Sequence, residues 1–234
     1  MRYDDPVLVR KQYEREDNLR ARQNLYEETS GPHAPDVLWQ TLVEWGPRRV
    51  LEVGGGPGEL SERIQNELGA RVSFVDLSPR MVELAQVRGI DAQVGDIQEL
   101  PFEDGTFDTV VAAWMLYHVP DIDRGLAEVA RVLQPGGALV AVTNSVHHLR
   151  ELRDLVAQPN LWAETFSREN GESYLGRHFA HIDRFDMETI VTVRDRQKLV
   201  AYCDSMNLET QPVPGDVELP FIVHGRSSIF LATT

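Results

Sequence analysis

VLEVGGGPGEL, residues 50–60, joins a short apolar run to a glycine-rich turn and then to a segment suited to a helix. Gly54, Gly56 and Gly58 can adopt positive φ and let a ligand lie against the backbone, where any Cβ would collide. A helix that starts after this turn points free N–H groups and positive dipole at the ligand. This order of elements indicates a nucleotide-like cofactor, although an ordinary tight turn would explain the glycines alone.

Two acidic residues near the ends of predicted strands, Asp76 and Glu52, indicate which class of cofactor the turn would bind. Asp76 lies roughly twenty residues beyond the turn, where a carboxylate can accept both ribose hydroxyls. N-capping of a helix that starts at Ser78 is the alternative role for Asp76. Glu52 precedes the glycines, where a negative charge would be unfavourable beside the pyrophosphate of a dinucleotide. It suits a cofactor that carries a sulfonium and an amino group, and neighbouring backbone N–H groups could also satisfy it.

Apolar runs and helical patterns alternate between Arg48 and Asn144. The strands predicted there cover 49–53, 71–77, 91–96, 107–114 and 137–144, and the helices cover 58–68, 79–88 and 123–133. Strands rich in Val and Leu with intervening helices predict a parallel sheet covered on both faces. Right-handed crossovers leave a doubly wound α/β arrangement as the main candidate.

The segments that flank this core have looser patterns. The helices predicted there cover about 6–28, 35–45, 145–157, 167–177 and 196–206, and the strands cover 182–193 and 221–233. The late strands can add an antiparallel edge to the sheet. We therefore expect a single domain over 1–234. It divides into an N-terminal helical cap at 1–46, a cofactor-binding core at 47–144, and a C-terminal half at 145–234 with substrate-side helices and edge strands.

Composition limits the class of protein. The chain has 234 residues, of which 42% are hydrophobic and 26% charged, as in a globular protein with one sizeable core. Its net charge of −14 disfavours nucleic acid as a partner, because phosphate backbones are bound mainly through Lys and Arg. No apolar run reaches the roughly 18–20 residues of a membrane helix, and no signal peptide is visible. The single cysteine, Cys203, favours a reducing cytoplasmic location and a packing role.

Four motifs in order carry a resemblance to a known family. They are VLEVGGGPGEL (50–60), VDLSPRMVELA (75–85), VGDIQELPFEDGTFDTVVAAWMLYHVPD (94–121) and RVLQPGGALVAVTNS (131–145). Between about Arg48 and Asn144 the chain resembles the class I S-adenosylmethionine-dependent methyltransferases of the small-molecule type. The extra glycine, Gly55, falls where residues vary widely in that family. The flanking segments match no pattern that we can assign to one substrate.

The resemblance implies a fold, a cofactor and a set of binding residues. The fold would be a Rossmann-like doubly wound sheet of seven strands, mostly parallel with an antiparallel last strand, and helices on both faces. The cofactor would be S-adenosyl-L-methionine. The implied contacts are Glu52, Gly54, Gly56 and Gly58 for the methionine part, Asp76 for the ribose, Leu77, Asp96 and Ile97 for the adenine, and Ala113 through its backbone.

Candidate catalytic and closing residues lie after the strands and on the first helix. His118 follows the fourth predicted strand and titrates near neutral pH, so it is the candidate general base, with a structural or cofactor-side histidine as the alternative. Tyr13 and Arg22 could close over the cofactor carboxylate, or simply pack an amphipathic helix. His147 and His148 follow the fifth predicted strand, where they could face a substrate or lie in solvent on a helix.

No metal-ligating cluster is visible in the sequence, because Asp121 and Asp123 are expected to cap the helix at 123–133. LQPGG, residues 133–137, predicts a turn between helix and strand. Four aromatic residues outside the core could line an acceptor pocket, although core packing is the default. They are Trp162, Phe166, Tyr174 and Phe179.

The sequence therefore favours an enzyme that transfers a methyl group from S-adenosylmethionine to a small molecule. Three alternatives remain: a methyltransferase acting on RNA or protein, a non-catalytic S-adenosylmethionine-binding protein, and an NAD-dependent oxidoreductase. The acceptor, the methylated element and the oligomeric state are not indicated by the residues.

Overall fold

Eight strands form one mixed sheet in the computed structural model, which describes residues 16–158, 165–205 and 211–234. Their spatial order is β1-β7-β8-β6-β5-β2-β3-β4. The strands are β1 (Thr29–Ser30), β2 (Arg49–Val53), β3 (Arg71–Asp76), β4 (Asp91–Val94), β5 (Phe107–Ala113), β6 (Leu133–Asn144), β7 (His181–Val193) and β8 (Phe221–Thr233). Strands β2 to β6 pair in parallel, and β8, β7 and β1 pair antiparallel to their neighbours.

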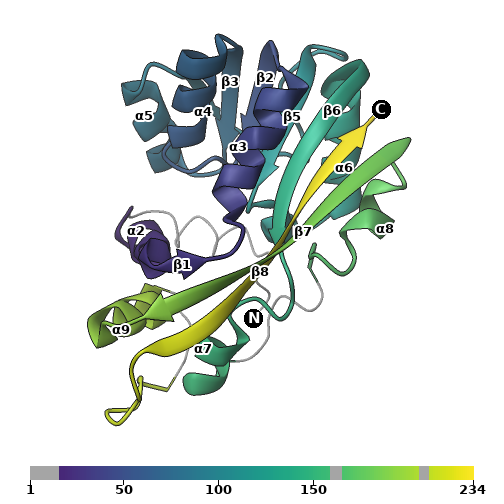
Figure 1. Cartoon of the computed structure of the whole chain (residues 1–234). Coiled ribbons are helices and arrows are strands. Elements are labelled where there is room, and N and C mark those ends of the chain that lie inside the picture. Colours follow the sequence, from purple (N-terminus) through teal and green to yellow (C-terminus); the bar gives the residue numbers. More distant parts are fainter. Residues whose placement is uncertain (1–15, 159–164, 206–210) are drawn as a thin grey trace.

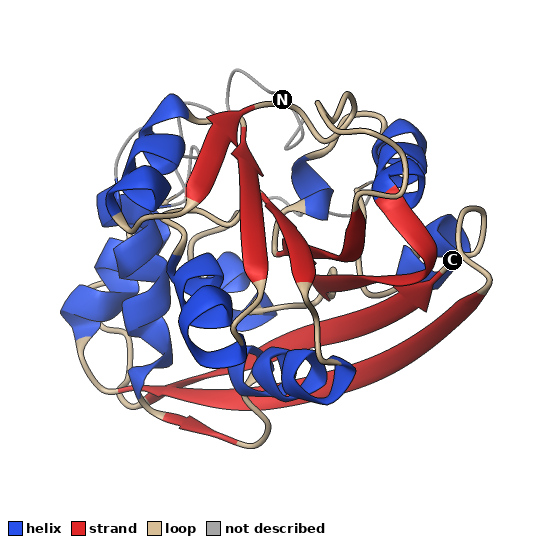
Figure 2. Ribbon diagram, turned by 90° about the horizontal axis from the view of Figure 1, so that it is seen from above, coloured by secondary structure: helices blue, strands red, loops and turns tan. Residues whose placement is uncertain are grey.

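Helices cover both faces of this sheet (Figures 1 and 2). They are α2 (Glu16–Asn24), α3 (Ala34–Trp45), α4 (Glu59–Arg63), α5 (Pro79–Val87), α6 (Ile122–Val132), α7 (Arg150–Leu155), α8 (Gly171–Leu175) and α9 (Arg196–Ser205). Short turns of helix lie at η1 (Leu25–Glu27), η2 (Ile64–Leu68) and η3 (Leu116–His118). In the described ranges, no helix has the length and apolar character needed to cross a membrane.

Successive residues of each central strand are buried on opposite faces, which explains the continuous apolar runs in the sequence. Val110 packs with α6 and α8 in one buried cluster, while Val111 packs with α3, η2 and α5 in another. The prediction of a doubly wound α/β fold with antiparallel late strands is therefore confirmed.

Several local predictions differ from the structure. The sheet has an eighth strand, because β1 pairs two residues with Ile190 and Val191 of β7. The helices predicted at 145–157 and 167–177 shorten to α7 and α8. LQPGG is not a separate turn but the first part of β6, where the register shifts and Gly136 has a φ of 76°. Pairing of Leu133 with Phe107 draws this glycine-rich segment into the strand as an irregularity.

The hairpin of β7 and β8 extends beyond the parallel strands. β8 pairs with β6 over 227–233, but its first part, 221–226, pairs with β7 alone. This extension and the elements packed around it form what we call the outer lobe, residues 16–30, 145–158, 188–205 and 211–226. The lobe has its own buried core, which includes Leu25, Leu152, Val191, Leu199, Cys203 and Val223. Figure 1 shows α2, α7 and α9 gathered around the extension.

Candidate functional site

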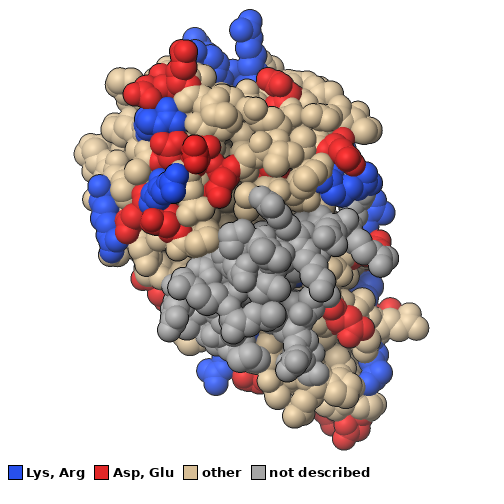
Figure 3. All heavy atoms as spheres, turned by 180° about the vertical axis from the view of Figure 1, so that it is seen from behind, with Lys and Arg blue, Asp and Glu red and all other residues tan. Residues whose placement is uncertain are grey.

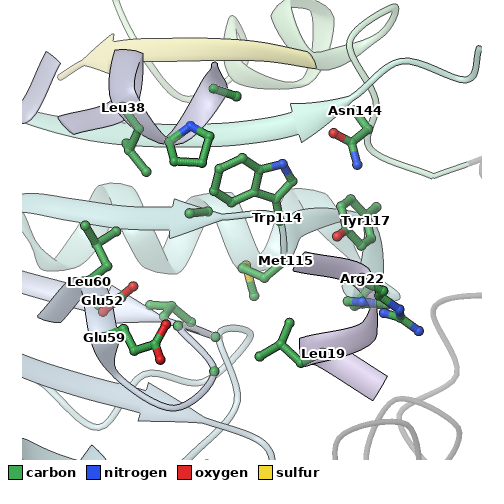
Figure 4. Close-up of a pocket in the computed structure, with 18 of the residues that line it drawn as sticks. Leu19, Arg22, Leu38, Glu52, Glu59, Leu60, Trp114, Met115, Tyr117 and Asn144 are labelled. Atoms are coloured by element: carbon green, nitrogen blue, oxygen red, sulfur yellow. The ribbon is translucent and has the colours of Figure 1, made fainter. Parts of the chain in front are cut away.

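A cavity of about 780 Å³ lies between the carboxyl ends of the parallel strands and the outer lobe. Its size falls in the range of small-molecule and cofactor sites, about 300–1,000 Å³. The wall nearest the sheet comes from the segments after β2, β3, β4 and β5, and the opposite wall comes from η1, β7, β8 and α9. Figure 4 shows Glu52 of β2, Trp114 after β5 and Arg22 of α2 among the residues that line this space.

The glycine turn after β2 is shaped by positive φ and close packing. Gly54, Gly56 and Gly58 have φ of 66°, 61° and 79°. Gly54 and Gly56 line the cavity with Gly55, where an added Cβ would lie 2.3 Å from the Cδ atom of Glu52. Gly58 lies outside the cavity lining; a Cβ there would meet the Cβ of Ala85 at 2.9 Å. Its role is the close approach of α4 to α5, so it shapes the turn without lining the cavity.

Glu52 is a buried carboxyl at the cavity floor. Only 1% of its surface is exposed, and the Ser61 hydroxyl donates a hydrogen bond to Oε2. Burial, with a smaller contribution from the charge of Asp76, raises the pKa of Glu52 to about 7. The carboxyl is therefore held in a place where its charge is costly unless a cation arrives.

Asp76 lies on the neighbouring strand end and also lines the cavity. Its Oδ1 accepts the Ser78 N–H at 2.8 Å, and burial raises its pKa to about 6. The N-cap of α5 is Ser78, whose hydroxyl accepts from Met81 N–H, so the alternative that Asp76 caps this helix is wrong. No Lys or Arg within the described ranges pairs with either carboxyl, Glu52 or Asp76.

The structure brings Leu77, Asp96, Ile97 and Ala113 to the same cavity, as their positions after strands predict. Ile97 is buried against the core, and the Asp96 carboxylate accepts Gln98 N–H at 2.9 Å. Apolar side chains beside two buried carboxyls without a cationic partner fit a cofactor that has an adenosine part and a cationic part. The chemistry of this wall therefore agrees with S-adenosylmethionine better than with a dinucleotide.

Of the candidate catalytic residue His118 and the residues predicted to close over the cofactor, Tyr13 and Arg22, only His118 and Arg22 lie in the described part of the chain. His118 lines the cavity but is only 6% exposed, and its ring packs edge-on to Tyr117 with centroids 4.6 Å apart. Arg22 also lines the cavity, and its guanidinium donates to the Ser205 carbonyl at 2.9 Å. It thereby joins α2 to α9. Tyr13 lies outside the described residues, and closure over a cofactor carboxylate stays a prediction.

The C-terminal aromatic residues pack in the core. Phe166 and Phe179 are buried and Tyr174 packs against them, while Trp162 lies outside the described residues. Cys203 is buried in α9, as predicted, and burial raises its pKa to about 11. Phe166, Tyr174 and Phe179 are therefore not among the residues that line the cavity.

Asp121 is the N-cap of α6 and accepts Arg124 N–H, as predicted, whereas Asp123 pairs with Arg177 and His178. Among the residues that the structure describes, no group of three or more His, Cys, Asp or Glu side chains could hold a metal ion.

Sequence reasoning missed several residues that line the cavity. Trp114 directly follows β5 with a φ of 55°, a rare conformation for an aromatic residue, and Asn144 ends β6. Both could have been found, because ligands in such sheets bind beyond the carboxyl ends of the strands. Tyr26 and His148 are joined across 122 residues, and their proximity has no local sequence signal.

Comparison with known proteins gives matches over the parallel part of the chain. Residues 51–141 match the family model described as a methyltransferase domain. A ubiquinone/menaquinone biosynthesis C-methyltransferase, UbiE, of Citrifermentans bemidjiense is 36% identical over 120 residues, which cover 47% of this chain and 51% of the relative. A ubiquinone biosynthesis O-methyltransferase of Xanthomonas oryzae pv. oryzae is 41% identical over 102 residues, 41% of this chain and 42% of the relative. The chain thus spans about half the length of the curated relatives it matches.

Solved structures show the fold over a longer stretch. The YcgJ protein of Bacillus subtilis superposes with a TM-score of 0.62 at 18% identity, over 86% of this chain and 98% of that one. A phosphoethanolamine N-methyltransferase 2 of Haemonchus contortus gives a TM-score of 0.67 at 19% identity, over 100% of this chain and 61% of that one. At these identities the likeness concerns the fold alone.

Proposed function

We infer, from the premise that this chain belongs to the class I S-adenosylmethionine-dependent methyltransferases, that it transfers a methyl group from S-adenosylmethionine to a small molecule. The observation that carries this proposal is the pair of buried carboxyls, Glu52 and Asp76, which line one cavity and have no Lys or Arg partner among the described residues. A ligand that brings its own positive charge and ribose hydroxyls would satisfy both.

Each part of the cofactor has residues suited to it. The Glu52 carboxylate, in the turn of Gly54 and Gly56, would face the cationic methionine part, because an opposite charge favours the ionised form of a buried carboxyl. Asp76 would accept the ribose hydroxyls. Asp96 would accept a hydrogen bond from the adenine amino group, and Leu77 and Ile97 would pack against the adenine ring. Ala113 would supply a backbone contact.

S-adenosylmethionine supplies a methyl carbon bonded to a positively charged sulfur. The contribution of the chain is to hold an acceptor in line with that carbon and to keep water away from it. Trp114, Met115 and Tyr117 line the cavity beside the strand ends, and their apolar surfaces can do both. Positioning of this kind lowers barriers by up to about 7–11 kcal/mol in favourable models. His118 stays the candidate base for an acceptor that must lose a proton.

The size of the cavity and the charge of the chain support a small acceptor over RNA. An RNA substrate would need a continuous basic surface, but on the face shown in Figure 3 Lys and Arg side chains lie among Asp and Glu side chains. Several Arg side chains are paired; Arg88, for example, forms ion pairs with Glu59 and Glu62. Two curated relatives are named as methyltransferases of ubiquinone or menaquinone biosynthesis, which supports a small-molecule acceptor.

Calorimetry tests the cofactor assignment. Saturable binding of S-adenosylmethionine and S-adenosylhomocysteine is expected, with no binding of NAD. Replacing Asp76 by Ala should weaken binding about tenfold or more, the loss expected for charge-assisted hydrogen bonds. Asp183→Ala, at an exposed position of β7, is the matched control and should leave binding unchanged. Binding of NAD alone would overturn the proposal.

Turnover distinguishes an enzyme from a cofactor-binding protein without activity. Release of S-adenosylhomocysteine in the presence of a panel of small acceptors is expected from the enzyme. His118→Ala should lower turnover strongly and leave cofactor affinity nearly unchanged if His118 removes the acceptor proton. Equal turnover rates in the two proteins would exclude that role.

A further inference from the structure

A hydrogen-bonded pair of side chains, Tyr26 and His148, lines the outer part of the cavity. Tyr26 Oη lies 2.8 Å from His148 Nε2. Burial lowers the pKa of His148 to about 4 and raises the pKa of Tyr26 well above its usual range. Both side chains are therefore neutral at pH 7, and the tautomer of the imidazole determines which of them donates the hydrogen bond.

The backbone of Arg226 indicates that tautomer. Its N–H donates to His148 Nδ1 at 2.9 Å, and its carbonyl oxygen accepts Ser145 N–H at 2.9 Å. The same carbonyl lies 3.0 Å from Nδ1, but a proton on Nδ1 would leave the Arg226 N–H facing another donor. A buried N–H without an acceptor is costly, so the ring proton belongs on Nε2. His148 therefore donates to Tyr26 Oη.

This assignment leaves the hydroxyl proton of Tyr26 for the cavity. His148 is the only hydrogen-bond partner of the Tyr26 hydroxyl within residues 16–158, 165–205 and 211–234. A phenol that accepts one hydrogen bond from His148 can still donate its own proton. Tyr26 thus presents a donor to whatever occupies the outer part of the cavity.

Two further donors face the same space. The side-chain oxygen of Asn144 accepts the Ser227 hydroxyl at 2.8 Å, which leaves the amide N–H groups of Asn144 for the cavity. The indole N–H of Trp114 has no acceptor in the described part of the chain. Figure 4 shows both side chains in the cavity, with Asn144 on the side away from Glu52.

The fold brings the three residues that carry these donors to the lining of one cavity. Trp114 follows β5 and Asn144 ends the neighbouring parallel strand β6, and the backbone N–H of Trp114 donates to the backbone carbonyl of Val142 at 2.8 Å. Asn144 lies opposite Ser227 in the register of β6 and β8, next to Arg226, whose backbone holds the imidazole that orients Tyr26.

We propose that this donor set binds the methyl acceptor through a carbonyl or carboxylate oxygen, which accepts hydrogen bonds from Tyr26, Asn144 and Trp114. An ammonium group would face three hydrogen-bond donors there, so an oxygen acceptor is favoured over an amine as the group that is bound. His148 is a positioning residue that acts through Tyr26. The inference rests on the proposed function, because it assigns the substrate class of that same cavity.

Nitrogen-15 NMR of the imidazole rings tests the tautomer in the protein without ligand. We expect His148 to carry its proton on Nε2, with Nδ1 unprotonated. His148→Asn identifies the signals by their loss, and His147→Asn, at the exposed neighbouring histidine, should keep them. A proton on Nδ1 would overturn the proposal, since Tyr26 would then donate to His148 and not to the cavity.

Ligand binding tests the donor set. Calorimetry first establishes that S-adenosylhomocysteine binds; its failure would contradict the proposed function and not the tautomer. The loaded protein is then titrated with benzoate, acetophenone and benzylamine. We expect benzoate or acetophenone to bind and benzylamine not to bind. The stronger of the two oxygen ligands shows whether the site prefers a carboxylate or a neutral carbonyl.

Variants connect this binding to the named donors. Tyr26→Phe should weaken the bound oxygen ligand about fivefold to tenfold, the loss of one neutral hydrogen bond, and leave S-adenosylhomocysteine affinity unchanged. Tyr174→Phe removes a hydroxyl outside the cavity lining and should change neither. Stronger binding of benzylamine, binding of none of the three, or equal affinity in Tyr26→Phe would overturn the proposal.

Discussion

The two walls of the cavity are assembled from different kinds of sequence information. On the sheet side, Gly54, Asp76 and Ala113 each lie at a strand end, so parallel pairing alone brings them together. On the outer side, Tyr26 and His148 meet although 122 residues separate them. The sheet-side wall, where the proposed cofactor would lie (the cofactor wall), therefore follows from local motifs, whereas the contact of Tyr26 with His148 in the opposite wall depends on the packing of the outer lobe. The predictions below test this contrast.

The largest expected effect is the loss of a buried side chain in the outer lobe. Leu152→Ala removes a buried residue from the core of that lobe and should lower its local stability by about 2–5 kcal/mol. Hydrogen exchange should show faster opening of α7, α9 and the hairpin extension. Affinity for S-adenosylhomocysteine should stay unchanged.

Leu139→Ala is the matched change in the core beneath the cofactor wall. It should lower the stability of the parallel strands by a similar amount and weaken cofactor binding. If Leu152→Ala also destabilised the parallel strands and abolished cofactor binding, the two walls would be one cooperative unit and the contrast would fail.

The next effect concerns Glu52, whose buried charge we expect to lower the stability of the ligand-free protein and to favour binding of the cationic cofactor. Glu52→Gln removes the buried charge and keeps an acceptor for Ser61. At pH 8 we expect the ligand-free protein to gain about 1–3 kcal/mol of unfolding free energy, because a desolvated charge is removed. Affinity for S-adenosylmethionine should fall about tenfold or more. Denaturant unfolding measures the unfolding free energy, and calorimetry measures the affinity. A fall in both quantities in Glu52→Gln would show that Glu52 stabilises the fold.

The pKa values of Glu52 and Asp76, about 7 and about 6, predict opposite pH dependences for stability and binding. Both folded-state values lie above those of the unfolded chain, so the stabilisation is greatest at low pH and is lost as pH rises toward 7. Binding of a cation needs the ionised carboxyls, so affinity should fall as pH drops from 8 to about 5.5. Calorimetry across this range checks the sign; a flat profile in wild type and in Glu52→Gln would contradict it.

The smallest effect is expected from an exposed ion pair between η1 and α9. Lys198 pairs with Glu27 near the outer end of the cavity. Lys198→Ala should change unfolding free energy by less than about 1 kcal/mol, because exposed ion pairs contribute little. Thermal unfolding at low and high salt measures it. A loss of several kcal/mol would show that ion pairs, and not the buried core, hold the outer lobe in place.

Most of the parallel core was predictable, since strand and helix periods there are set by neighbours in sequence. β2 has the predicted bounds, and Glu52, Asp76 and Asp96 meet at one sheet edge as expected. The helix predicted at 145–157 was too long because the segment after β6 makes contacts across the fold: Leu149 N–H donates to His224 O at 2.9 Å. Such a bond competes with helix formation and has no local signature.

The residues alone determined a glycine turn, a row of apolar strands and carboxyls at strand ends, because each of these follows from φ preference, periodicity and parallel pairing. Only the tertiary structure decided that Gly58 packs against Ala85, that Arg22 joins α9, and that Tyr26 meets His148. The contacts of Arg22 and Tyr26 depend on the β7–β8 hairpin, against whose extension α7, α9 and η1 pack beside the edge of the parallel strands. Burial and hydrogen-bond partners across that distance are properties of the folded chain, not of any stretch of its sequence.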